Sequence, residues 1–103
     1  MHKKYKLRYL PLFECDMAIT RDYIAFNLKN PMAALRLIQD VEKAILKRLE
    51  NPLYFEPYRS AKIRNQQYYR INIRNFSLFY VVIGDVMEVR RFVYSRRDIQ
   101  GII

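Results

Sequence analysis

The stretch YYRINIRNFSLFYVVIGDVMEVRRFVY, residues 68–94, decides the fold. Residues 69–73 alternate between apolar and polar side chains, which predicts a half-exposed strand. Residues 78–83 are nearly all apolar, as expected of a central strand. Gly84-Asp85 is a two-residue hairpin signal, and a last strand follows at residues 86–94. The stretch therefore predicts a three-stranded antiparallel meander.

The sequence before the meander predicts a strand and a first helix. Residues 5–10 alternate apolar and basic side chains, which predicts a half-buried strand that stops at Pro11. A helix is expected from Phe13 to Leu28, because a helical stripe runs through Phe13, Met17, Ile24 and Leu28. A second apolar stripe, Ile19, Tyr23 and Phe26, lies well round the helix and is either more core or a surface for a partner.

A second helix is predicted from Pro31 to Glu50. Asn30 is a typical N-cap, and Pro31 suits the first helical position. Asn51-Pro52 ends the helix. Its apolar face is Ala34, Ile38, Val41, Ile45 and Leu49. With so short a connection, the two helices should form an antiparallel hairpin.

The predicted order is β-α-α-β-β-β, an α+β fold in one domain spanning residues 1–103. The antiparallel sheet should carry the helical hairpin on one face and leave the other partly open. Residues 53–67 are expected to form an ordered loop. Residues 96–103 are expected to form a short helix or a mobile tail.

The charge of the chain is strongly positive and unevenly distributed. The net charge is +9, and the nine cations of residues 59–103, eight of them Arg, face only three acids. Arginine presents a planar fork of donors that grips phosphate at two points. This composition favours nucleic acid or the ribosome as a partner over an ordinary solubilising surface.

Several kinds of site are excluded by composition. The single cysteine, Cys15, and the single histidine, His2, cannot form a zinc site, a disulfide or a catalytic triad. No glycine-rich phosphate loop is present, and the acids are too few in the second half for a carboxylate metal site. We therefore expect no metal and no cofactor. Without a long apolar run or a leader sequence, we expect no membrane partner and a cytoplasmic location.

A set of cations and one tyrosine remains as a candidate site for metal-free RNA cleavage. RNA carries its own nucleophile, so the reaction needs positioning, positive charge at the phosphate and a group that handles protons. Arg70, Tyr94 and Arg96 are the candidate catalytic residues, with Tyr94 alternatively an amphipathic residue at a sheet edge. The candidate nucleic-acid contacts are Arg59, Lys62, Arg64, Arg91 and Arg97.

Two motifs resemble the RelE/ParE toxins of type II toxin–antitoxin systems. They are Tyr68-Tyr69-Arg70-Ile71-Asn72-Ile73, opening one strand, and Val89-Arg90-Arg91-Phe92-Val93-Tyr94-Ser95-Arg96-Arg97-Asp98, closing the last. The resemblance covers roughly residues 5–100 and implies the fold predicted above. In the RNA-cleaving branch, an Arg at the position of Arg70 and basic residues in the preceding loop contact the phosphate, and a residue near Tyr94 transfers protons. Many members have His where this chain has Tyr94.

The resemblance implies a partner and leaves the target open. A cognate antitoxin should cover the toxin, and the stripe Ile19, Tyr23 and Phe26 would suit it. We favour ribosome-dependent cleavage of mRNA as the activity. The family's other branch inhibits DNA gyrase with the same fold and no RNA cleavage, and a degenerate, non-toxic binding protein is a third possibility.

Overall fold

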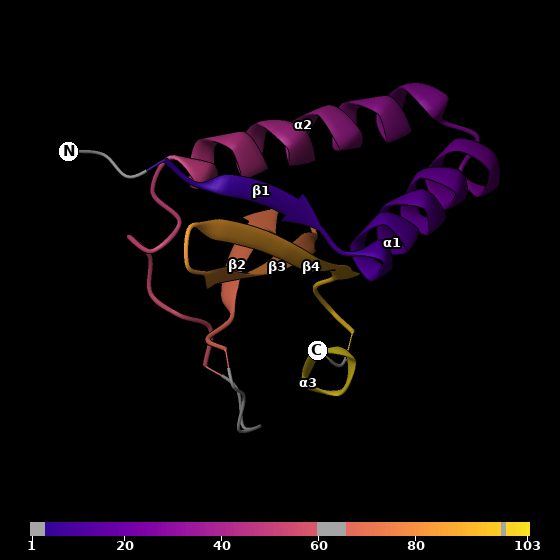
Figure 1. The fold of residues 1–103 in the computed structure, drawn as a ribbon. Helices are drawn as coiled ribbons and strands as arrows, with labels where there is room; N and C mark the ends of the chain where they lie inside the picture. Colours follow the sequence, from indigo (N-terminus) through magenta and orange to yellow (C-terminus); the bar gives the residue numbers. More distant parts are fainter. Residues whose placement is uncertain (1–3, 60–65, 98) are drawn as a thin grey trace.

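The computed structural model describes residues 4–59, 66–97 and 99–103 (Figure 1). The chain begins with strand β1 (Lys6–Tyr9), followed by helix α1 (Pro11–Asp22), a π-helical turn (Tyr23–Asn27) and helix α2 (Pro31–Leu49). Strands β2 (Tyr69–Ile73), β3 (Phe76–Ile83) and β4 (Val86–Tyr94) come next, and a short helix α3 (Ile99–Ile102) ends the chain. The predicted β-α-α-β-β-β order is confirmed. Of the two alternatives for residues 96–103, a short helix or a mobile tail, the structure has the short helix α3.

The four strands form one sheet in the order β1-β4-β3-β2. The meander β2-β3-β4 is antiparallel, with Gly84 at φ 62° in the tight β3–β4 turn. β1 pairs with β4 in parallel, so the sheet is mixed at this one edge. The prediction of an antiparallel sheet therefore holds for the three strands joined by short turns. β1 precedes the helices in the chain and is joined to the meander by no short turn, so its own sequence does not determine whether it runs parallel or antiparallel to β4.

The helical hairpin forms as the sequence predicts, with small shifts at its ends. Asn30 caps α2, because its side-chain oxygen accepts a hydrogen bond from the Ala33 amide at 3.1 Å. α1 begins at Pro11, two residues earlier than expected, because proline suits the first helical turn. The predicted first helix ends in a π-helical turn, Tyr23–Asn27, which is wider than a turn of α-helix.

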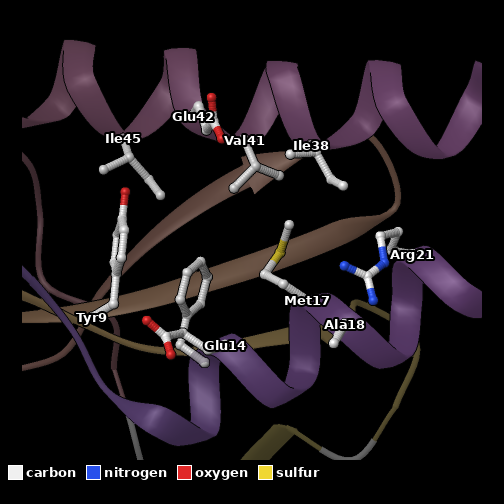
Figure 2. A pocket seen from close by; sticks show the side chains of 10 residues that line it. Tyr9, Glu14, Met17, Ala18, Arg21, Ile38, Val41, Glu42 and Ile45 are labelled. Atoms are coloured by element: carbon white, nitrogen blue, oxygen red, sulfur yellow. The ribbon is translucent and has the colours of Figure 1, made fainter.

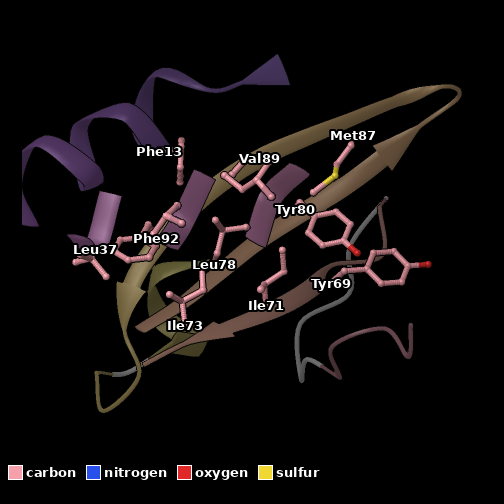
Figure 3. Packing of buried hydrophobic residues seen from close by; sticks show 12 residues of the cluster. Phe13, Leu37, Tyr69, Ile71, Ile73, Leu78, Tyr80, Met87, Val89 and Phe92 are labelled. Carbon is pink, nitrogen blue, oxygen red and sulfur yellow. The ribbon is translucent and has the colours of Figure 1, made fainter. Parts of the chain in front are cut away.

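The main core lies between the hairpin and one face of the sheet (Figures 1 and 3). α2 contributes Leu37, Val41 and Ile45, and α1 contributes Phe13. The strands contribute a facing set: Tyr69, Ile71, Ile73, Leu78, Tyr80, Met87, Val89 and Phe92. The rings of Tyr69 and Tyr80 stack with centroids 5.3 Å apart. We call this side of the sheet the hairpin face.

A second, smaller cluster covers part of the opposite side of the sheet, which we call the open face. Its buried residues are Tyr68, Phe79, Val81, Val93 and Ile99, with Tyr58, Ile102 and Ile103 packed against them. α3 lies on this side, across the sheet from the hairpin (Figure 1). The open face is therefore covered at one end by α3 and by the segment around Tyr58.

Candidate functional site

Arg70 lies on the open face within a small polar cluster. It stands opposite Phe79 in the β2–β3 register, and Phe79 belongs to the open-face cluster. Its Nε donates a hydrogen bond to Ser77 Oγ at 2.9 Å. Ser77 Oγ lies 2.9 Å from Ser95 Oγ, which brings the end of β4 into the same cluster. The Arg70 guanidinium also lies 5.7 Å from the centroid of the Tyr58 ring. These contacts hold Arg70 in one position against the sheet.

Tyr94 lies on the other side of the sheet from Arg70. It is paired with Phe76, and its ring meets the Phe76 ring edge-on with centroids 5.8 Å apart. Phe76 stacks on Phe92 of the hairpin-face core at 4.9 Å. The Tyr94 side chain is 37% exposed. The structure therefore does not bring Tyr94 and Arg70 together on one face.

Three of the other cations predicted for the site, Arg59, Arg96 and Arg97, are exposed. Arg96 and Arg97 are exposed just after β4, where the Arg97 amide donates to the Tyr94 carbonyl at 3.0 Å. Arg59 is exposed and lies 3.5 Å from a Glu56 carboxylate oxygen. Lys62 and Arg64 lie outside the described residues.

Arg91 has a structural partner that sequence reasoning missed. Its guanidinium donates to both carboxylate oxygens of Asp16 in α1, at 2.8 and 3.1 Å, and to the Ile102 carbonyl at 3.3 Å. The hydrogen bond to Asp16 raises the pKa of Arg91 above its ordinary value against the opposing effect of burial. Arg91 thus joins α1, β4 and α3, and the sequence carries no local signal of a pair 75 residues apart.

A second charged network lies on the open face around the buried carboxylate of Glu88. Arg8 of β1 and Arg90 both form ion pairs with Glu88, and Arg90 also donates to the Tyr68 hydroxyl at 3.2 Å. Burial lowers the pKa of Arg90, but Tyr68 and Glu88 outweigh it, so the pKa is raised overall. These cations are therefore tied into the sheet.

A groove of about 300 Å³ separates the two helices of the hairpin (Figure 2). Apolar side chains from both helices point into it, among them Met17, Ile38 and Val41. Two carboxylates, Glu14 and Glu42, lie near Tyr9 at one end, and Arg21 lies at the other. Burial, and then these two carboxylates, raise the pKa of Tyr9. The groove could accept an apolar segment with a cation near the Tyr9 end.

The stripe Ile19, Tyr23 and Phe26 is exposed, so it is not part of the core. The side chains are 68%, 54% and 73% exposed, respectively. Leu12, at 56%, precedes Ile19 by the same seven residues that separate Ile19 from Phe26. This seven-residue spacing was the signal that could have added Leu12 to the stripe. These four exposed side chains form an apolar stripe along α1 and the π-helical turn that follows it, which we call the outer side of α1, and they are not additional core.

Neither a metal site nor a membrane span is found in the part of the chain that the structure describes. No three His, Cys, Asp or Glu side chains gather there to hold a metal ion. Within the same residues, no helix combines the length and the apolar composition needed to cross a bilayer.

The fold resembles that of a solved structure from a toxin–antitoxin system. A chain of the chromosomal ParDE system from P. aeruginosa superposes with a TM-score of 0.69 at 18% identity, covering 89% of this chain and 97% of that one. A chain of the RelB-RelE antitoxin–toxin complex from Methanococcus jannaschii gives a TM-score of 0.46 at 22% identity, covering 84% and 88%. No curated protein sequence matches the chain significantly.

The sequence model of one family, described as "ParE toxin of type II toxin-antitoxin system, parDE", matches residues 7–99. The match runs from β1 through the hairpin and the whole meander to the start of α3. It therefore includes all the elements that build the main core. The chain belongs to the ParE toxin family of type II toxin–antitoxin systems.

Proposed function

We propose that this toxin arrests growth by inhibiting DNA gyrase, as the ParE branch of the superfamily does, and that it does not cleave RNA. The observation that carries the proposal is the separation of Arg70 from Tyr94 by the sheet. A proton-transferring group must reach hydrogen-bonding distance of the reacting atoms that the phosphate-binding cation holds. Two groups on opposite faces of one sheet do not meet this condition. The family match over residues 7–99 supports the same branch.

The contacts of Arg70 also support a structural role for it. Its Nε is engaged by Ser77, which is fully buried, and its guanidinium lies over two aromatic rings of the open face. A cation held in this way stabilises the pairing of β2 with β3. We infer that Arg70 supports the sheet rather than a transition state.

Ribosome-dependent mRNA cleavage is the second candidate, and one observation favours it. The cluster of Arg70, Ser77 and Ser95 lies directly before the exposed Arg96 and Arg97, so several cations stand at the same end of β4. In that case Arg70 and Arg96 would stabilise charge on the phosphate. Arg59, Lys62, Arg64 and Arg97 would then bind the backbone of the message, whereas the Arg91 guanidinium is already held by Asp16 and the Ile102 carbonyl.

A variant of Tyr94 separates the two activities. Tyr94→Phe removes one hydroxyl and keeps the ring against Phe76, so the fold should survive. Under the gyrase proposal, induced Tyr94→Phe should arrest growth as fully as the parent chain, with DNA-damage signalling and intact message. Primer extension on a translated reporter reads the message. A loss of toxicity of about 10²–10⁴-fold, with cleaved message from the parent chain, would establish the nuclease instead.

We further propose that a cognate antitoxin covers the outer side of α1. Leu12, Ile19, Tyr23 and Phe26 are each more than half exposed and lie along one side of the helix, which suits an amphipathic partner. The net charge of +9 favours an acidic antitoxin. The neutralised complex would be located in the cytoplasm, in accordance with the composition of the chain.

A further inference from the structure

A pocket of about 380 Å³ lies at the C-terminal end of α2, and its lining shares no residue with the groove between the helices. It includes Ile71 of the hairpin face, whereas the Arg70 side chain lies on the open face. The residues that matter for its chemistry are Lys47, Arg48, Glu50, Tyr54, Phe55 and Ile71. The pocket therefore combines aromatic rings, an aliphatic floor and charged groups at its rim. Its lining carries one net positive charge, since Lys47 and Arg48 face the single carboxylate of Glu50.

The two aromatic side chains of the pocket are unusually accessible. Tyr54 is 84% exposed and Phe55 is 44% exposed. Their ring centroids are 6.0 Å apart and the ring planes make an angle of 84°. Two accessible rings set nearly at right angles form a corner against which a flat group can stack on one ring and meet the edge of the other.

Arg48 makes this corner rigid and cationic. Its guanidinium carbon lies 3.5 Å from the centroid of the Phe55 ring. Its Nη1 donates to the Tyr80 hydroxyl at 3.0 Å, and that hydroxyl donates to the Pro52 carbonyl at 2.7 Å. Tyr80 and Pro52 are both fully buried. The corner is thus anchored to the core before any ligand arrives, which lowers the entropic cost of binding.

A line of cations leads along α2 to the pocket. Arg36, Lys43 and Lys47 are exposed and lie on one side of the helix, at spacings of seven and four residues. Asp40, on the same side, is paired with Arg74 of the β2–β3 turn, so the acid in this line is neutralised. From Arg36 to Lys47 the line extends about 16 Å. This is the arrangement in which a cationic track follows a phosphate backbone beside a stacking platform.

We propose that the pocket binds an unpaired base of single-stranded nucleic acid, with the neighbouring phosphates along the Arg36–Lys47 side of α2. An isolated phosphate fits less well, because the pocket lining carries only one net positive charge and offers aromatic faces. A duplex also fits less well, because its bases are not available for stacking. This site is independent of gyrase inhibition, and its test needs no gyrase.

The test measures binding of a fluorescent single-stranded oligonucleotide of about 12 nucleotides to the full chain by anisotropy, over a range of salt concentrations. Tyr54→Ala should weaken binding about 5- to 100-fold, and Tyr54→Phe, which keeps the ring, should stay within about 2-fold. Tyr23→Ala removes another exposed tyrosine, 54% exposed and on the outer side of the hairpin, and should leave oligonucleotide binding unchanged. Circular dichroism confirms that each variant is folded.

The salt dependence tests the cationic track separately. Lys47→Gln should reduce the slope of log Kd against log salt by about 0.7, the share of one phosphate contact on a single strand. Lys29→Gln, an exposed lysine at the tip of the hairpin, is the matched control and should leave the slope unchanged.

Three results would overturn the proposal. Tyr54→Ala could bind the oligonucleotide as tightly as the parent chain, or Tyr23→Ala could weaken it equally, which would mean that binding is diffuse. Equal affinity of the parent chain for a duplex of the same length would also exclude a base-stacking site. If Tyr54→Ala instead weakened only binding to the antitoxin or to a gyrase subunit, the pocket would be a protein-docking surface.

Discussion

The carboxylate of Asp16 receives hydrogen bonds from the Arg91 guanidinium and, at 3.0 Å, from the Phe92 amide. The side chains of Arg91 and Asp16 are 23% and 13% exposed. Asp16→Asn removes the charge and leaves Arg91 partly buried without its counter-ion. We expect a loss of about 1–3 kcal/mol in the free energy of unfolding, measured by urea denaturation.

Asp22→Asn is the matched control for Asp16→Asn. Asp22 pairs with Arg21 in the same helix, but both side chains are about half exposed, so the change should cost less than about 1 kcal/mol. Equal losses for the two variants would mean that the Asp16–Arg91 pair does not join α1 to β4 as described.

The ionisation of Tyr80 should make the free energy of unfolding depend on pH in the alkaline range. Burial raises its pKa above the ordinary value near 10, and the hydrogen bond and charge of Arg48 only partly offset this. The unfolded chain therefore ionises Tyr80 first, so its contribution is complete below pH about 10 and is lost as the pH rises toward the folded pKa. At pH 8, Tyr80→Phe should be less stable by about 1–3 kcal/mol, because Arg48 and the Pro52 carbonyl lose a partner.

Urea denaturation of the parent chain and Tyr80→Phe between pH 8 and 11 tests this. The difference in stability between them should shrink above pH 10. A constant difference across the range would show that Tyr80 ionises equally in the folded and unfolded states.

At the residue scale, the sequence indicates the kinds of side chain in the candidate site better than their contacts. Arg70 and Tyr94 were predicted to act together because both belong to recognisable motifs near strand ends. The β3–β4 register shifts at a bulge at Arg90, and a bulge changes which strand residues share a face. The alternation of residues along the strands therefore could not assign the faces of Arg70 and Tyr94 without knowledge of this bulge. The Asp16–Arg91 pair depends on how a helix crosses the sheet, which no local pattern reports.

Helix α2 depends on its N-cap for a defined start. Asn30→Ala removes the acceptor of the Ala33 amide and should cost about 1 kcal/mol in the free energy of unfolding. Asn30→Asp keeps the acceptor and should be close to the parent chain. Thermal or urea unfolding measures both, and equal loss in the two variants would show that the cap oxygen contributes nothing.

The outer side of α1 is the element that the proposed antitoxin should recognise. Phe26→Ser removes a side chain that is 73% exposed, so it should leave the fold stable and weaken antitoxin binding at least 10-fold in a titration. Leu46→Ser, on α2 and 57% exposed, is the matched control. Equal affinity of the parent chain and Phe26→Ser for the antitoxin would place the antitoxin elsewhere on the toxin.

Elements with strong local signals were predicted best. Asn30-Pro31 and Gly84-Asp85 fix a helix start and a turn through side-chain and backbone chemistry that acts within a few residues. The π-helical turn Tyr23–Asn27 had no such signal, since its residues also suit an α-helix. The side of the sheet on which β1 pairs is a long-range property, and it became visible only in the assembled fold.

At the scale of the whole molecule, the fold has three different surfaces: the two faces of the sheet and the outer side of α1. The hairpin face is filled by core, the outer side of α1 is apolar, and the open face holds Arg70 and the charged network around Glu88. The family match covers the elements that carry these surfaces, whereas the target depends on which of them meets a macromolecule in the cell.

The most direct test of the central proposal is a supercoiling assay with purified gyrase, relaxed plasmid and the refolded toxin, alongside a translation reaction containing ribosomes and a defined message. We expect the parent chain and Tyr94→Phe alike to abolish supercoiling at toxin concentrations comparable to that of gyrase, and to leave the message intact. Normal supercoiling together with message cleaved in the ribosome would contradict it.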